Sequence, residues 1–420
     1  MSHIIYATLF DTGAPQNENI HMSLVPAEKQ QICRPRGRLF FIVLAFMLAA
    51  AAIPLDGCLG SSVVAWGAGK FVANPTDGTN FGQSIIPANL TNAVQVAASW
   101  SQSVAVKADG TIQGWGNDDI GQIDFPAGSN YEAVACGQLH SAALNSNGTV
   151  TAVGDDSFGQ TPVPTGISNV VAVSCGFFHS LVLKSDGTLA AWGGEGGVDY
   201  GQGTVPNNVS NIVAIAAGGY FNLALRANGT VLAWAGQNSG ETNVPGNLSN
   251  VVAIAAGGWH GLALKSNGTV VAWGENSDGQ TEVPANLSNV VAIAAGSWHS
   301  LALKSNGTVV AWGFNDNGQT NVPANLTNVV QLAGGWYNNL ALVGNGPPST
   351  SVVLAGPEFG TNGFSVSLPS QNGHVYQLQY STSLTNASWQ SLPLNAGTGH
   401  TLILADPTVS PQRFYRAVQW

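Results

Sequence analysis

The chain repeats itself with a period of about 40 residues, and this constrains its fold more than any other feature. Val251 to Gly274 reads VVAIAAGGWHGLALKSNGTVVAWG, and Val290 to Gly313 reads VVAIAAGSWHSLALKSNGTVVAWG. Such a period is typical of one supersecondary unit that recurs along the chain. The tryptophan near the end of the unit recurs as Trp66, Trp115, Trp192, Trp234, Trp273 and Trp312, and a seventh copy has Val153 there.

Each unit has the pattern of short β-strands. Val290 to Ala295 is a continuous apolar run, which predicts a buried strand. Ser300 to Lys304 alternates, with leucines on one face, and Asn306-Gly307 then predicts a hairpin with a type I′ turn. Thr308 to Trp312 is the return strand, and Gly318 to Pro323 predicts a short fourth strand. Four antiparallel strands per unit make a propeller blade.

The two ends of the repeat array are complementary. Val63 to Gly67 supplies a third strand without a first or second, while Val329 to Gly335 and Asn339 to Leu342 supply a first and second without a third. Joining them removes exposed sheet edges, whereas an open solenoid would need polar capping units. We therefore predict an all-β chain. Its main body is a seven-bladed β-propeller closed by pairing of N- and C-terminal strands, and a small β-sandwich-like domain follows.

The motifs of the unit resemble a known repeat. Gly296 to Leu303, Gly307 to Gly313 and Gly318-Gln319 resemble the regulator of chromosome condensation repeat. The compact form is similar to that of bacterial members, such as the second type of β-lactamase inhibitory protein. That resemblance implies binding through aromatic loops on one propeller face, at Trp259, Trp298 and Trp336.

Residues 1 to 57 have the features of a leader. Arg34, Arg36 and Arg38 precede the apolar run Leu39 to Ile53, which is typical of a signal segment and short for a membrane span. We expect export to the cell surface or the extracellular space. An uncleaved anchor, or lipidation at Cys58, is an alternative; after removal of the leader we expect no membrane insertion.

Charge excludes some partners. The formal net charge is −10, and 8% of residues are charged. Nucleic acids and anionic membrane surfaces attract basic proteins, so we expect neither as a partner. We expect a monomer that binds an extracellular protein or glycan.

The composition changes after the propeller, which we place at residues 58 to 345. Residues 346 to 350 are rich in Gly and Pro and predict a linker. Residues 351 to 420 then alternate as strands and resemble the small β-sandwich tails of large secreted bacterial proteins, through Tyr376 to Leu384, Trp389 and Phe414 to Arg416. We expect this domain to serve in display or surface association.

Histidines and cysteines recur at fixed repeat positions. His140, His179, His260 and His299 share one position, to which we also assign Asn222 and Asn338. Such recurrence favours a hydrogen bond within each residue's own hairpin over catalysis or metal binding. Cys136 and Cys175 stand where other units have alanine, which favours small buried thiols; a disulfide between blades is the alternative.

Aromatic residues gather between the first and second strands of the units, and they are our candidate binding site. Because every blade repeats the same path, these segments lie on one face, and Tyr and Trp are preferred interface anchors. Packing against the core is the alternative. The candidates are Trp100, Phe177, Tyr220, Trp259, Trp298, Trp336 and Tyr337.

We expect no enzyme activity, cofactor, metal or catalytic residue. The alternative is a hydrolase or lyase that acts on polysaccharide with acidic loop residues. That reading requires several acids at non-equivalent positions to converge at one mouth of the channel. The acids to consider are Asp118, Asp119, Asp155, Asp156, Glu195 and Asp199.

Overall fold

The computed structural model describes residues 4–8, 21–25, 61–70, 79–128, 130–345, 354–360, 363–382, 388–408 and 413–420. Within these ranges the regular structure is β-strand, apart from one 3-10 turn at Gly196–Val198. Most of the predicted leader and the whole predicted linker lie outside the described residues. Within the described part, no helix is long and apolar enough to cross a membrane.

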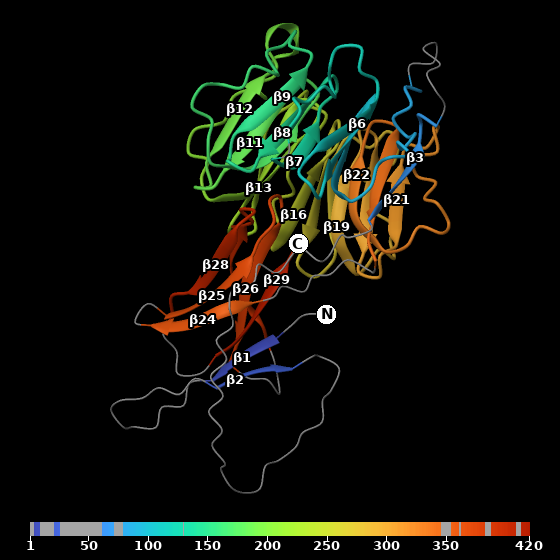
Figure 1. Cartoon of the computed structure of the whole chain (residues 1–420). Helices are drawn as coiled ribbons and strands as arrows, with labels where there is room; N and C mark the ends of the chain where they lie inside the picture. Colours follow the sequence, from blue (N-terminus) through green and yellow to red (C-terminus); the bar gives the residue numbers. More distant parts are fainter. Residues whose placement is uncertain are drawn as a thin grey trace, which may run out of the picture.

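Seven three-stranded antiparallel sheets form the propeller (Figure 1). Six follow the chain: β4 (Ala93–Ala98), β5 (Gln102–Lys107), β6 (Ile112–Gly116); β7 (Tyr131–Cys136), β8 (His140–Asn145), β9 (Val150–Gly154); β10 (Val170–Cys175), β11 (His179–Lys184), β12 (Leu189–Gly193); β13 (Ile212–Ala217), β14 (Phe221–Arg226), β15 (Val231–Ala235); β16 (Val251–Ala256), β17 (His260–Lys265), β18 (Val270–Gly274); β19 (Val290–Ala295), β20 (His299–Lys304), β21 (Val309–Gly313).

The seventh blade joins the two ends of the repeat array, as predicted. β22 (Val329–Gly334) and β23 (Asn338–Val343) come from the end of the array, and β3 (Ser62–Gly67) comes from its start. In the β23–β3 pair, Asn339 lies opposite Trp66 and Val343 lies opposite Ser62. The inner strand of every blade therefore has neighbouring blades on both sides, and the ring is closed.

The middle strands form the core of the ring. In β17, Leu262, Ala263 and Leu264 have no exposed surface, and the equivalent residues of the other blades are similarly buried. The blade tryptophans are also buried; the indole of Trp312 donates a 3.0 Å hydrogen bond to the carbonyl of Gln280, in the connection from the preceding blade. The tryptophans therefore fill the gaps between blades, and all except Trp234 also donate a hydrogen bond across the gap.

Two local predictions were wrong. Gly318 to Pro323 is not a strand, because most of its backbone amides bond within the same loop, as from Val322 to the Thr320 carbonyl. The hairpin turn is not type I′ either, because only Gly307 has positive φ (80°). A bond from the Gly307 amide to the Lys304 carbonyl, with Gly307 left-handed, makes a type I turn with a bulge.

The C-terminal domain is a two-layered β-structure. One sheet contains β24 (Ala355–Gly360), β25 (Gly363–Pro369) and β28 (Thr401–Asp406). The other contains β26 (Val375–Ser381), β27 (Gln390–Ala396) and β29 (Phe414–Gln419), and β1 (Ile4–Thr8) and β2 (His21–Val25) extend it beyond β29. The sheets share a core in which Phe364 stacks on Tyr415. The sequence analysis missed β24 and β27.

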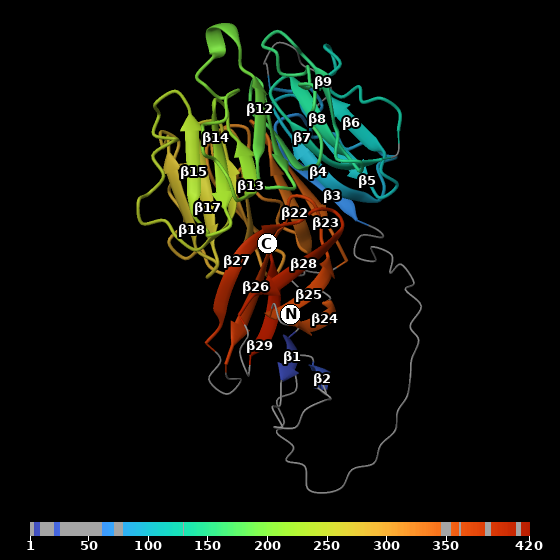
Figure 2. The ribbon, with the colours of Figure 1, turned by 90° about the vertical axis from the view of Figure 1, so that its left-hand side faces the viewer.

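The C-terminal domain contacts one end of the propeller (Figures 1 and 2). The Leu394 amide donates to the carbonyl of Ala227, just beyond the end of β14, and the Asn372 amide group donates to Glu132 at the start of β7. Both propeller residues lie at the end where the second and third strands are joined, which we call the hairpin face. The opposite end, where the first and second strands are joined, is the tip face.

Candidate functional site

The tip face is built from seven equivalent turns. In each, a residue just after the first strand donates its amide to a carbonyl three residues later, as from Gly257 to His260 at 2.8 Å. Two residues remain at the tip, and we call them the inner and outer positions. The inner residues are Trp100, Gln138, Phe177, Gly219, Gly258, Ser297 and Trp336; the outer residues are Ser101, Leu139, Phe178, Tyr220, Trp259, Trp298 and Tyr337.

Backbone hydrogen bonds link the tips around the axis. The amide of Phe177 donates to the Gly219 carbonyl, and the amide of Gly258 donates to the Ser297 carbonyl, both at 3.1 Å. The same bond runs from the amides of Gln138 and Gly219 to the next inner residue. The amides of Ser297 and Trp336 donate instead to the carbonyls of Gly335 and Ser99, one residue before the inner position, and in the last step the Ser99 side chain donates to the Gly137 carbonyl. Since buried backbone groups need partners, this belt fixes the tips relative to one another and provides a rigid base for their side chains.

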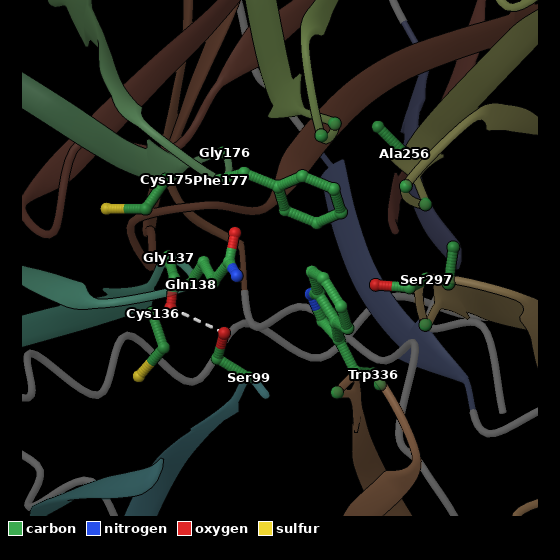
Figure 3. Close-up of a pocket in the computed structure, with 18 of the residues that line it drawn as sticks. Ser99, Cys136, Gly137, Gln138, Cys175, Gly176, Phe177, Ala256, Ser297 and Trp336 are labelled. Atoms are coloured by element: carbon green, nitrogen blue, oxygen red, sulfur yellow. Dashed lines mark hydrogen bonds between the residues drawn. The ribbon is translucent and has the colours of Figure 1, made fainter. Parts of the chain in front are cut away.

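Phe177 and Trp336 fill the centre of the belt. Figure 3 shows the two rings facing each other across the axis; their centroids are 4.7 Å apart. They line a cavity of about 60 Å³, which has room for only a few water molecules. Drug-sized ligands need roughly 300 Å³ or more, so this mouth of the channel is closed to them.

All seven predicted site residues belong to one network of ring contacts. Phe177 contacts Tyr220 at 5.4 Å and Trp259 at 5.3 Å, and Trp259 stacks on Trp298 at 4.1 Å. On the other side of the axis, Trp336 contacts Trp100 at 5.7 Å and Tyr337 at 6.1 Å. The tertiary structure thus gathers residues from six blades into a continuous aromatic surface.

The sequence analysis missed the outer part of this surface. Phe81, Phe158 and Tyr200 contact the tip rings from the connections between blades, and Phe314 contacts Tyr337. A signal was present, because the first three each precede Gly-Gln at the same repeat position. We call the tip rings together with these four residues the aromatic face.

Exposure divides the aromatic face into two parts. Phe177 is 6% exposed and packs at the centre of the belt, which agrees with the packing alternative for this residue. Trp259, Trp298, Trp336 and Tyr337 are half-buried, and Tyr200 is 42% exposed. These rings are held by their neighbours and still present surface to a ligand.

Acidic residues surround the aromatic face. The segments that follow the third strands start beside the tips, as shown by the 3.0 Å bond from the Glu275 amide to the Trp259 carbonyl. We call the half-buried or exposed acids between each third strand and the Gly-Gln pair that follows it the rim carboxylates. They are Asp118, Asp119, Asp155, Asp156, Glu195, Asp199, Glu275, Asp278 and Asp316.

The rim carboxylates have the hydrogen bonds of turn residues. Asp155 accepts bonds from Ser157 and Gln160, and Asp199 accepts one from the Gly201 amide, all within their own loops. Burial, with the charge of Asp124, raises the pKa of Asp118. Among the described residues, no three His, Cys, Asp or Glu side chains are arranged to hold a metal ion.

The recurring histidines bond the neighbouring blade, not their own hairpin as predicted. Nε2 of His260 lies 3.0 Å from Oγ of Ser300, which donates in turn to the Gln280 carbonyl at 2.8 Å. Burial lowers the pKa of His260 to about 3 and that of His299 to about 4, so the rings are neutral. These histidines lock blade to blade.

The assignment of Asn222 to the histidine position was also wrong. Phe221 pairs with Ala235 exactly where His260 pairs with Gly274, so Phe221 occupies that position. Asn222 lies one residue later and accepts the 2.9 Å bond from His179 of the preceding blade. Because this blade has Phe221 where other blades have histidine, the sequence pattern did not show that Asn222 lies one position later.

Cys136 and Cys175 are both free thiols on neighbouring blades. They line the axial cavity (Figure 3). Burial raises the pKa of Cys136 to about 12 and raises that of Cys175 as well. Cys175 is buried and Cys136 is half-buried, so the structure agrees with the interpretation as small buried thiols in full for Cys175 and in part for Cys136.

Comparison with known proteins supports the propeller. Residues 131–160, 170–202, 212–239, 251–280 and 290–319 match the model of the regulator of chromosome condensation (RCC1) repeat. The structure of Prp20p from Saccharomyces cerevisiae, described with its binding to Gsp1p and histones, has a TM-score of 0.56 at 18% identity and covers 68% of this chain and 92% of its own. The structure of human WBSCR16 has a TM-score of 0.52 at 19% identity, and the match covers 68% of this chain and 98% of WBSCR16.

These similarities define the class: five segments of the chain match the RCC1 repeat, and the chain folds as an RCC1-like propeller with an additional C-terminal β-domain. At this level of identity the solved structures establish the fold alone. No curated protein matches the sequence. The resemblance to bacterial inhibitory proteins stays a prediction.

Proposed function

We propose that this protein is a binding propeller that recognises another protein through its aromatic face. The observation that carries the proposal is the ring network: half-buried Trp and Tyr side chains from several blades form one surface on a rigid belt. Aromatic residues held in place in this way are the usual anchors of protein interfaces, because little side-chain entropy remains to be lost on binding.

The shape of the site favours a protein over a small molecule. Its central cavity, which Phe177 and Trp336 line, is only about 60 Å³. An extended surface with a closed centre fits a broad partner. Prp20p, which has the same fold, has been crystallised with Kap60 bound, so this fold is compatible with protein binding.

The remaining parts of the proposal concern location and display. The predicted leader supports export, so we place the partner outside the cytoplasm. The C-terminal domain contacts the hairpin face, through the bond from Leu394 to Ala227. Attachment through that domain leaves the aromatic face free. The polysaccharide-cleaving alternative gains no support from the rim carboxylates, which bond within their own loops.

The test compares variants of the two faces. The full chain, immobilised through its C-terminus, is used to isolate partners from extracellular material, and any partner is then titrated against purified variants. Trp259→Ala and Trp298→Ala should each weaken binding about tenfold or more, the effect of losing an interface anchor. Ile403→Ala, at an exposed residue of the C-terminal domain, is the control.

Two results would contradict the proposal. One is a partner whose affinity is unaffected by both tryptophan variants while the variants stay folded. The other is a ligand that proves to be a glycan, with binding abolished by free sugar.

A further inference from the structure

The charges of the propeller are divided between its two faces. The nine rim carboxylates lie at the tip face, where Lys70 is the only Lys or Arg among the described residues. The other basic residues of the propeller lie at the opposite end, because five middle strands each end on one at the hairpin face. These are Lys107, Lys184, Arg226, Lys265 and Lys304.

From this division we infer that the partner presents a cationic segment, rich in arginine, to the aromatic face. This inference rests on the proposed function and specifies the chemistry of its partner. The site combines half-buried rings with rim carboxylates that form no ion pair among the described residues, and an arginine side chain complements both. A guanidinium stacks on an aromatic ring and also forms hydrogen-bonded pairs with carboxylates.

The centre and the rim contribute differently. Trp259 and Trp298 form a stacked pair of indole rings, with centroids 4.1 Å apart and ring planes at 27°, and both side chains are half-buried. A cation over such rings contributes most where water is excluded. Exposed ion pairs at the rim contribute little affinity each, but together they steer a cationic partner and make binding depend on salt.

The chain already uses this chemistry in its C-terminal domain. The guanidinium of Arg413 lies 3.9 Å from the ring centre of Tyr380 and pairs with Asp406, while that of Arg416 lies 4.4 Å from the ring centre of Trp389.

The experiment uses defined peptide probes on the full chain. A fluorescent peptide of alternating Arg and Gly-Ser is titrated by anisotropy against a peptide of equal length with citrulline in place of arginine. Citrulline keeps the shape of the side chain and removes its charge. We expect the arginine peptide to bind, with an affinity that falls as the salt concentration rises. The citrulline peptide should bind at least about tenfold more weakly than the arginine peptide, because cation–π contacts and charge pairing are lost together.

Matched variants locate the binding. The rim variant combines Asp156→Asn, Glu195→Gln, Asp278→Asn and Asp316→Asn. It should bind the arginine peptide several-fold more weakly, and the affinity should depend less on salt concentration. The control combines Asp109→Asn and Asp186→Asn at the hairpin face. Asn already fills this turn position in other blades, as at Asn267 and Asn306, so the control should fold and bind as the unchanged chain does.

The outcomes separate this inference from the proposed function. The inference of a cationic segment would be overturned if the arginine and citrulline peptides bound equally well. It would also be overturned if the rim variant and the control changed binding of the arginine peptide to the same extent. If the tryptophan variants weaken the binding of an isolated partner while the rim variant leaves that binding unchanged, the proposed function stands and this inference fails. If neither tryptophan variant affects partner or peptide, both are wrong.

Discussion

His299 Nε2 lies 2.6 Å from Oδ1 of Asn339, and this contact joins the sixth blade to the blade that closes the ring. Asn339 also donates to the Gln319 carbonyl at 2.8 Å and pairs across the β23–β3 ladder with Trp66. One residue thus connects three segments that are distant in the sequence, two through its side chain and one through its backbone. The closing blade is bonded to its neighbour as the others are.

We predict that His299→Ala lowers the free energy of unfolding by about 1–3 kcal/mol, because it leaves the fully buried Asn339 amide oxygen without its donor. Chemical denaturation of the full chain measures this change. The control is His400→Ala, since His400 is exposed. If His299→Ala and the unchanged chain had the same midpoint of unfolding in denaturant, the bond from His299 to Asn339 would not stabilise the contact between the blades.

Stability should fall in mild acid. The folded-state pKa values of the four buried histidines are lowered to about 3 or 4, from about 6.5 in the unfolded chain. Their contribution is complete above pH 6.5 and is lost as pH falls toward those folded values, because the unfolded state binds the additional protons. Denaturation midpoints measured from pH 7.5 to pH 5 follow this loss, before most carboxylates titrate.

The pH dependence can be assigned to single residues. His260→Phe removes one titrating ring, and Phe221 shows that this position accommodates phenylalanine. In this variant the free energy of unfolding should change less steeply with pH between 5 and 6.5, by up to the equivalent of one bound proton. An unchanged slope would mean that other groups are responsible.

Removing β3 should disrupt the ring. A chain that begins at residue 68 lacks the strand that pairs with β23, so β23 becomes an exposed edge and Leu340 and Leu342 lose neighbours. We expect oligomers or aggregates by size-exclusion chromatography, with a chain that begins at residue 58 as the control. A monomeric and equally stable shorter chain would be inconsistent with closure by this pair.

The centre and the surround of the aromatic face should respond differently to truncation. Phe177→Ala removes a 6%-exposed ring that contacts four other rings, so it should destabilise the protein by about 3–5 kcal/mol. Trp298→Ala removes a half-buried ring and should cost less stability while weakening binding. Thermal unfolding of both variants measures the difference, and a larger loss for Trp298→Ala would reverse our assignment.

The cysteines should react only after unfolding. Cys136 and Cys175 are free, and burial raises the pKa of both thiols, so few thiolates are present at neutral pH. A thiol reagent followed by mass spectrometry should label them slowly in buffer and quickly in denaturant. Rapid labelling of the folded chain would contradict their placement.

The sequence by itself determined the repeat, the three strands of each blade and the closure between β23 and β3. It could do so because alternation and hairpin signals are local, and because the two incomplete units complement each other. It also identified the seven aromatic residues, since the tips differ between otherwise similar units. The predicted fourth strand failed because Gly318 to Pro323 satisfies most of its amides within local turns.

Only the tertiary structure decided how the blades act on one another. Bonds such as that from His260 to Ser300 join residues 40 positions apart, and no local pattern identifies the partner. The same holds for the belt of tip amides, the burial of Phe177 and the division of charge between the faces. These depend on which end of each strand meets its neighbours, and closing the chain into a ring determines that arrangement.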